Sequence, residues 1–68
     1  MNVEYFLTGG YVIHGIRLQG SSSRFSAWFD QAGELLDAER IDGLGRSYAP
    51  REKQRNQLAQ VGYPYANT

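Results

Sequence analysis

Alternating apolar and polar residues fill most of the first part of the chain and predict antiparallel strands. Residues 2–8, for example, place Val3, Tyr5 and Leu7 on one face and Glu4, Phe6 and Thr8 on the other. An alternation of this kind is typical of a strand with one face on a core and one toward water. Four ranges follow it closely enough to be predicted as strands: 2–8, 11–19, 24–30 and 34–41.

The second of these ranges contains a change of phase that predicts a β-bulge. Four of its residues are apolar enough to face a core, but the first two and the last two differ in parity: Tyr11, Ile13, Ile16 and Leu18. The change falls at His14-Gly15. One extra residue in the strand restores a common apolar face, and glycine tolerates the backbone geometry that this requires.

The range 34–41 (ELLDAERI) is the least settled of the four, because it consists largely of good helix formers. Asp30 and Gly33 precede it with the spacing of a type I turn that ends in a left-handed residue. Such a turn connects two strands. We therefore favour a strand for residues 34–41 and keep a helix as the alternative.

The C-terminal third predicts one helix after a flexible connection. Residues 42–47 contain two glycines and are expected to be flexible. Pro50 suits the first turn of a helix that spans residues 50–61, and Gly62 is a plausible stop. Residues 63–68 are then expected to form a loose tail.

Together these elements predict an α+β fold for a single domain, residues 1–68: an antiparallel meander of three to four strands with one C-terminal helix. A chain of 68 residues buries only about 60% of the surface that its unfolded form exposes, so its stability is marginal. Cysteine is absent, which excludes disulfides and thiolate metal sites. Pairing into a homodimer is a route to added stability that the sequence leaves open.

The remaining composition argues against several functional classes. The chain lacks a basic, apolar leader at its start and any apolar run long enough to cross a membrane, so we expect a cytoplasmic protein without membrane contacts. A single histidine, His14, makes a protein-only zinc site improbable. We expect no metal and no cofactor.

No pattern in the sequence predicts catalysis. No acid or nucleophile is placed beside His14, the one conventional general base. Ser21, Ser22 and Ser23 are not part of a Gly-x-Ser-x-Gly elbow, and the glycines do not have the spacing of a phosphate loop. We therefore assign no catalytic residue and expect a protein that is not an enzyme.

Trp28 motivates the first functional hypothesis, a small protein-binding module such as an inhibitor or adaptor encoded by a phage or mobile element. On the predicted strand Trp28 lies opposite the apolar face, and Phe6 is expected on the same outer side. Arg17 and Arg24 flank it. Tryptophan and arginine dominate the energetics of protein interfaces, so Trp28, Arg17, Arg24 and Phe6 are the predicted contact residues.

An uneven charge distribution motivates the alternative, a nucleic-acid-binding regulator. The net charge is zero, but residues 46–68 hold four basic side chains and one acidic one: Arg46, Arg51, Lys53, Arg55 and Glu52. Arg51 and Arg55 are one helical turn apart, as required to follow a phosphate backbone. The same charges are equally able to pair with the acidic strand at residues 34–41. A third possibility is a small subunit of a larger assembly.

Overall fold

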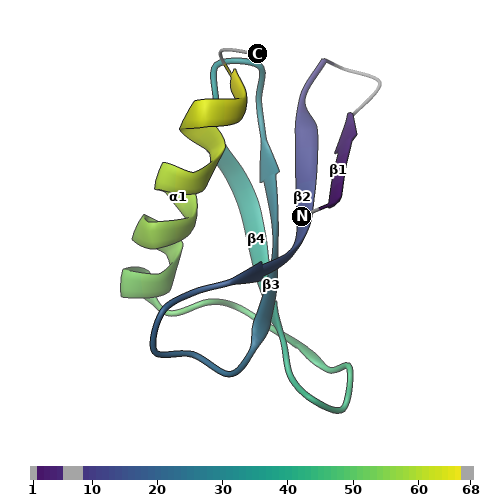
Figure 1. Ribbon diagram of the computed structural model, residues 1–68, viewed down its shortest axis with the longest axis vertical. Coiled ribbons are helices and arrows are strands. Elements are labelled where there is room, and N and C mark those ends of the chain that lie inside the picture. The colour runs from purple at the N-terminus through teal and green to yellow at the C-terminus, as the bar shows by residue number, and fades with distance from the viewer. Residues whose placement is uncertain (1, 6–8, 67–68) are drawn as a thin grey trace.

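The computed structural model of the protein describes residues 2–5 and 9–66, which form an antiparallel sheet with a helix on one of its faces (Figure 1). Five strands are neighbours in chain order: β1 (Asn2–Tyr5), β2 (Tyr11–Arg17), β3 (Arg24–Phe29), β4 (Leu35–Ile41) and β5 (Ser47–Tyr48). The helix α1 (Glu52–Ala66) follows and packs against β4. The predicted α+β meander is confirmed, and residues 34–41 are a strand rather than a helix.

Several predicted boundaries are wrong by one or two residues. β2 ends at residue 17 rather than 19, β3 ends at 29 rather than 30, and β4 begins at 35 rather than 34. The helix begins at Glu52 rather than at Pro50. Residues 6–8, the end of the predicted first strand, lie outside the described residues. The fifth strand was not predicted, because only Ser47 and Tyr48 pair with β4 and two residues are too few for an alternating pattern.

The predicted bulge in β2 is present. Ile13 and Ile16 are three positions apart, yet their partners on β3 are only two positions apart. His14 and Gly15 therefore lie opposite a single residue, Ser26. Gly15 has a φ of 72°, in the left-handed region that residues with a Cβ rarely adopt. The bulge returns the apolar residues on both sides of it to one face.

The core lies between this face of the sheet and α1. It contains residues from all the long elements: Tyr11, Ile13, Ile16, Leu18, Phe25, Ala27, Phe29, Ala38 and Leu58. Leu58 contributes the fully buried side chain of the helix and is 0% exposed. Val61 packs beside it and is partly buried. The helix is thus attached to the sheet by a narrow apolar stripe near its middle and C-terminal half.

Gly62 does not end the helix, as the sequence suggested, but lies inside it. The helix continues to Ala66, so residues 63–66 are helical and the predicted loose tail is wrong for this part of the chain. A Cβ on Gly62 would lie 2.1 Å from Cδ2 of the Phe29 ring. The Tyr11 hydroxyl also donates a hydrogen bond to the Gly62 carbonyl. Glycine is needed here because helix and sheet are in direct contact.

Two hairpin turns of the same chemistry flank β4. In the first, the Asp30 carboxylate accepts hydrogen bonds from the backbone N–H groups of Ala32 and Glu34, both at 2.9 Å. The Gly33 N–H donates to the Asp30 carbonyl at 3.0 Å, and Gly33 has a φ of 84°. The predicted type I turn with a following left-handed glycine is therefore confirmed.

The second turn replaces a segment that we expected to be flexible. Asp42 accepts from the N–H groups of Leu44 and Arg46 at 2.8 and 2.9 Å, and Gly45 has a φ of 79°. The Gly45 N–H donates to the Asp42 carbonyl at 3.0 Å. This turn reverses the chain between β4 and β5 and delivers Tyr48 to the sheet.

Within the described ranges, no helix is long and apolar enough to cross a membrane.

Candidate functional site

Three of the four residues predicted to contact a protein lie on the outer face of the sheet, the face that α1 does not cover. Trp28 pairs with Val12 and Asp37 and is half-buried. Arg17 and Arg24 lie directly opposite each other at the other end of β2 and β3, and both are exposed. The bulge separates Trp28 from these two arginines, so they do not form one compact cluster. Phe6 lies outside the described residues.

A chain of three polar side chains crosses the outer face at the bulge. Nε2 of His14 lies 3.6 Å from Oε1 of Glu4, and Nδ1 lies 3.1 Å from Oγ of Ser26. The set has the residue types of a hydrolytic triad. A nucleophile must reach its substrate, however, and Ser26 is only 7% exposed. The contacts instead satisfy a buried hydroxyl. Sequence reasoning missed the set because its members come from three strands.

The four basic residues of the nucleic-acid hypothesis separate into two groups. Arg46 is taken up by the second hairpin turn, where its Nε lies 2.9 Å from Oδ2 of Asp42. Arg51, Lys53 and Arg55 are exposed around the start of α1. None of these three forms an ion pair within the part of the chain that the structure describes. These three residues therefore do not pair with the acidic strand within the described residues, whereas Arg46 does pair with Asp42, which directly follows that strand.

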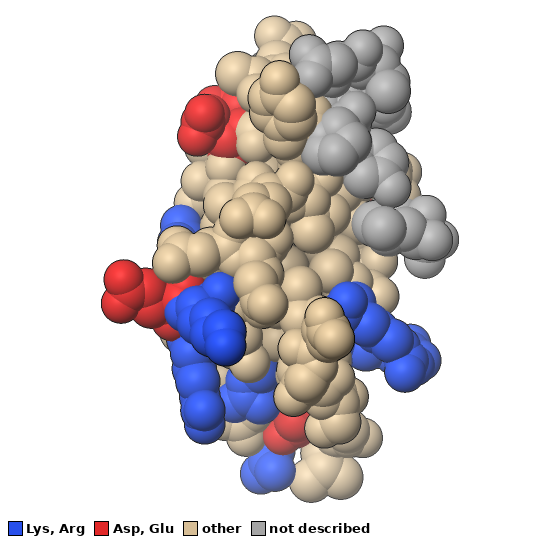
Figure 2. Space-filling model, turned by 60° about the vertical axis from the view of Figure 1, so that its left-hand side comes forward, with Lys and Arg blue, Asp and Glu red and all other residues tan. Residues whose placement is uncertain are grey.

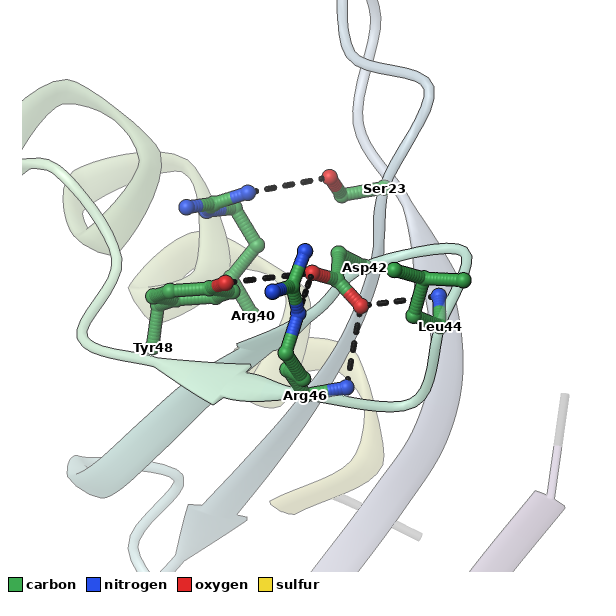
Figure 3. Close-up of polar contacts among 6 residues, drawn as sticks. All are labelled: Ser23, Arg40, Asp42, Leu44, Arg46 and Tyr48. Carbon is green, nitrogen blue, oxygen red and sulfur yellow. Dashed lines mark hydrogen bonds and ion pairs between the residues drawn. The ribbon is translucent and has the colours of Figure 1, made fainter.

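Arg40 on β4 joins these residues, although the sequence placed it in an acidic segment. Its guanidinium lies 4.6 Å from the centroid of the Tyr48 ring, and its Nη1 donates to Oγ of Ser23 at 3.4 Å (Figure 3). The Tyr48 hydroxyl in turn donates to Oδ2 of Asp42 at 3.2 Å. Arg40 is held in place from two sides. We call the four cations without an ion pair around α1 the basic end: Arg40, Arg51, Lys53 and Arg55.

Asp42 supports this arrangement as an ionised group. The hydrogen bond from the Arg46 backbone N–H is the largest influence and lowers the pKa of Asp42 below its ordinary value. Partial loss of hydration opposes the shift, and further hydrogen bonds from Leu44, the Arg46 side chain and Tyr48 lower the pKa again. The pKa of Tyr48 is raised, first by loss of hydration and then by its hydrogen bond to Asp42. Both groups keep their present protonation states at neutral pH.

Two adjoining hollows open at the basic end. The first has a volume of about 250 Å³ and is lined by Gly20, Ser21, Ser22, Ser23, Arg40, Arg51 and Gln54. The second, about 220 Å³, is lined by Leu18, Gln19, Gly20, Ser21, Arg51, Lys53, Gln54 and Gln57. They share Arg51, Gln54 and the start of the serine loop, and we call them together the basic groove. No acidic side chain lines either hollow.

The surface view shows where charged side chains gather on the side of the molecule that carries α1. In Figure 2 the basic side chains lie mainly over the lower half, with some acidic side chains among them. Sequence reasoning found the helical cations but missed Arg40 and the serine loop. These residues share one feature: they line the basic groove with side chains that can donate hydrogen bonds, and no acidic side chain lines it. The feature appears only when the fold brings β4, the loop at 20–23 and α1 together.

The described residues contain no group of three His, Asp or Glu side chains placed to hold a metal ion. Comparisons with known proteins found nothing similar to this chain: no family model, no curated protein and no solved structure matches it.

Proposed function

We propose that the protein binds nucleic acid through the phosphate backbone, using the basic end. The observation that carries the proposal is the set of cations that fold together without acidic partners. Arg40, Arg51 and Lys53 line the basic groove, and Arg55 extends the charge along α1. Arginine, lysine, serine and glutamine side chains are the groups that contact phosphates in protein–nucleic acid complexes. The groove offers all four.

The uneven placement of charge explains how a neutral chain can bind a polyanion. Two of the acidic side chains, Asp30 and Asp42, accept hydrogen bonds from the turn backbone, and Asp42 also pairs with Arg46. No cation of the basic end forms an ion pair with a described carboxylate, although exposed Glu52 lies between Arg51 and Lys53 in sequence and partly offsets their charge. Exposed charges farther apart than about 10 Å are largely screened at 0.1 M salt, so the local balance decides binding.

Salt dependence tests the proposal quantitatively. If the four cations of the basic end each neutralise one phosphate, the logarithm of the affinity falls with the logarithm of salt concentration with a slope of about −3 for a single strand and about −4 for a duplex. Fluorescence anisotropy of labelled oligonucleotides from low to physiological salt measures this slope. Failure of every DNA and RNA oligonucleotide to bind at low salt would refute the proposal.

A matched pair of variants locates the interface. Arg51→Gln and Arg46→Gln each remove one positive charge, but Arg51 lines the groove whereas Arg46 is paired with Asp42. We expect Arg51→Gln to weaken binding by about tenfold, as expected for one charge-assisted hydrogen bond. Arg46→Gln should change it by less than about threefold, a modest electrostatic effect for an exposed, paired charge. Equal losses would place the interface elsewhere.

The outer face of the sheet supports a second candidate, binding of a protein partner. Arg17 and Arg24 are directly opposite each other, an arrangement of like charges that destabilises a sheet. Neither forms an ion pair with a described residue, and half-buried Trp28 lies on the same face. Trp28→Ala and Arg24→Gln should release a protein captured from the native host. If both variants retain every captured partner, this face is not the contact surface.

A further inference from the structure

The first hollow of the basic groove is built from hydrogen-bond donors around a small space. Arg40 and Arg51 line it together with the serine loop at residues 21–23. Its volume of about 250 Å³ is ample for one tetrahedral anion with part of its water shell. A phosphate group presents three strong acceptor oxygens, and arginine matches them with parallel N–H donors. The composition of the hollow is complementary to that group.

Arg40 is positioned before any ligand arrives. Stacking on Tyr48 and the hydrogen bond to Ser23 restrain a side chain that would otherwise sample many rotamers. A restrained arginine loses less conformational freedom on binding, which favours affinity. Tyr48 is itself held by Asp42, whose charge is taken up by Arg46 and by backbone N–H groups. The carboxylate that holds Tyr48 in place therefore already has its negative charge balanced by other groups.

Two hydroxyls of the serine loop accept hydrogen bonds, and the third makes none within the described residues. Oγ of Ser21 accepts a hydrogen bond from the Ser23 N–H at 3.2 Å, and Oγ of Ser23 accepts from Arg40. Ser22 is exposed and its side chain makes no hydrogen bond within the described part of the chain. It lies on the hollow and is free to donate to a bound oxygen.

We infer that this hollow is a discrete binding site for a single phosphate group, held between Arg40 and Arg51 with the Ser22 hydroxyl as a further donor. The inference rests on the proposed function: if the protein binds nucleic acid, a phosphodiester of the backbone is the group that occupies this hollow. A phosphate monoester, free or at the end of a strand, has the same chemistry. The adjoining hollow, with Lys53 and Gln57, continues the groove toward the next unit of a strand.

Inorganic phosphate is the probe that isolates the site from the rest of the interface. Titrating phosphate into ¹⁵N-labelled protein at constant ionic strength, set with sodium chloride, should produce saturable shifts in the amides of residues 21–23 and in the Nε–H signals of Arg40 and Arg51. Arg40→Gln and Arg51→Gln should each weaken the phosphate affinity by about tenfold or more. Ser22→Ala should weaken it by about two- to tenfold, the effect of one neutral hydrogen bond.

Arg17→Gln is the matched control, because Arg17 is exposed on the face of the sheet that α1 does not cover and lines neither hollow. It removes the same charge and should leave phosphate affinity within about twofold, since an exposed charge on the opposite face is largely screened. Arg40→Gln also removes the contact with Tyr48, so its fold is checked by the dispersion of its amide spectrum. Arg51→Gln tests the site without this complication, because the Arg51 side chain does not stack on an aromatic ring of the described residues.

Oligothymidylates with and without a 5′ phosphate complete the experiment and separate its outcomes. Tighter binding of the 5′-phosphorylated strand assigns the site to a terminal monoester, and equal binding assigns it to the backbone; both support the inference. Shifts that do not saturate, or equal losses in Arg40→Gln and Arg17→Gln, overturn it even if oligonucleotides bind. If phosphate binds as described but no oligonucleotide does, the site stands and the proposed function fails.

Discussion

Replacing Gly62 with alanine tests the contact between α1 and the sheet, because two effects of opposite sign compete there. Alanine in a helix interior is more favourable than glycine by about 1 kcal/mol. Against this, the new Cβ would lie 2.1, 2.3 and 2.8 Å from three atoms of the Phe29 ring. Carbon atoms in contact are normally about 3.5–4.0 Å apart, so the helix or the ring must move by more than about 1 Å.

Phe29 has little freedom to move away. Its side chain is 0% exposed, and its ring stacks on Tyr11 with a centroid distance of 5.2 Å. Tyr11 also donates its hydroxyl hydrogen bond to Gly62, so a shift of the helix disturbs that bond as well. Overpacking a core costs about 1–3 kcal/mol and sometimes more. We place the cost near the upper end, so the net result is a loss of about 1–2 kcal/mol.

Urea unfolding followed by circular dichroism measures this loss, and a thermal scan should show a decrease of about 5–15 °C in Tm for a domain of this size. Gly43→Ala is the matched control. A Cβ at Gly43 meets no atom within 4 Å and its φ is not in the left-handed region, so this substitution should be neutral or stabilise by up to about 1 kcal/mol. If Gly62→Ala is as stable as the wild type, the close approach described here is wrong.

Three further predictions address the core, the bulge and the second turn. Leu58→Ala should destabilise the protein by about 2–5 kcal/mol in urea unfolding, because it removes a fully buried side chain of α1 and leaves a cavity. Gly15→Ala should lower stability by about 1–2 kcal/mol in the same assay, since its φ of 72° strains a residue with a Cβ although the space around it is open. The Asp42 carboxylate stabilises the fold above its unfolded pKa near 3.8, and this contribution is lost as pH falls through the lower folded pKa. The stability difference between wild type and Asp42→Asn should therefore shrink below about pH 4, and an undiminished difference there would contradict the assignment.

Features that depend on neighbours in sequence could be predicted for this chain. The parity change at His14-Gly15 located the bulge, because a strand has a strict period of two. The spacing of Asp30 and Gly33 identified a hairpin turn and decided between strand and helix for the following residues. The same turn chemistry at Asp42 was present in the sequence but was read as flexibility, since its extra glycine, Gly43, resembles a loop.

Features that depend on contacts between distant segments could not be predicted. A glycine near the end of a helical pattern is typical of a stop, and only the position of Phe29 shows that Gly62 permits close packing instead. Arg40 lies in an acidic stretch of sequence and joins the basic end only because β4 faces α1 and Tyr48. Trp28 was assigned to the outer face, where it lies, but the sequence could not show its separation from Arg24.

The paired turns at the two ends of β4 have a consequence for how this protein can change. Each turn is closed by its own aspartate and glycine. In the second turn, Gly43 and Leu44 lie between Asp42 and Gly45 and are exposed. Of these two, only Leu44 takes part in the closing hydrogen bonds, through its backbone N–H. These inner positions are therefore open to substitution while strand alignment is kept. Variation or engineering can alter the surface at these corners without redesigning the scaffold.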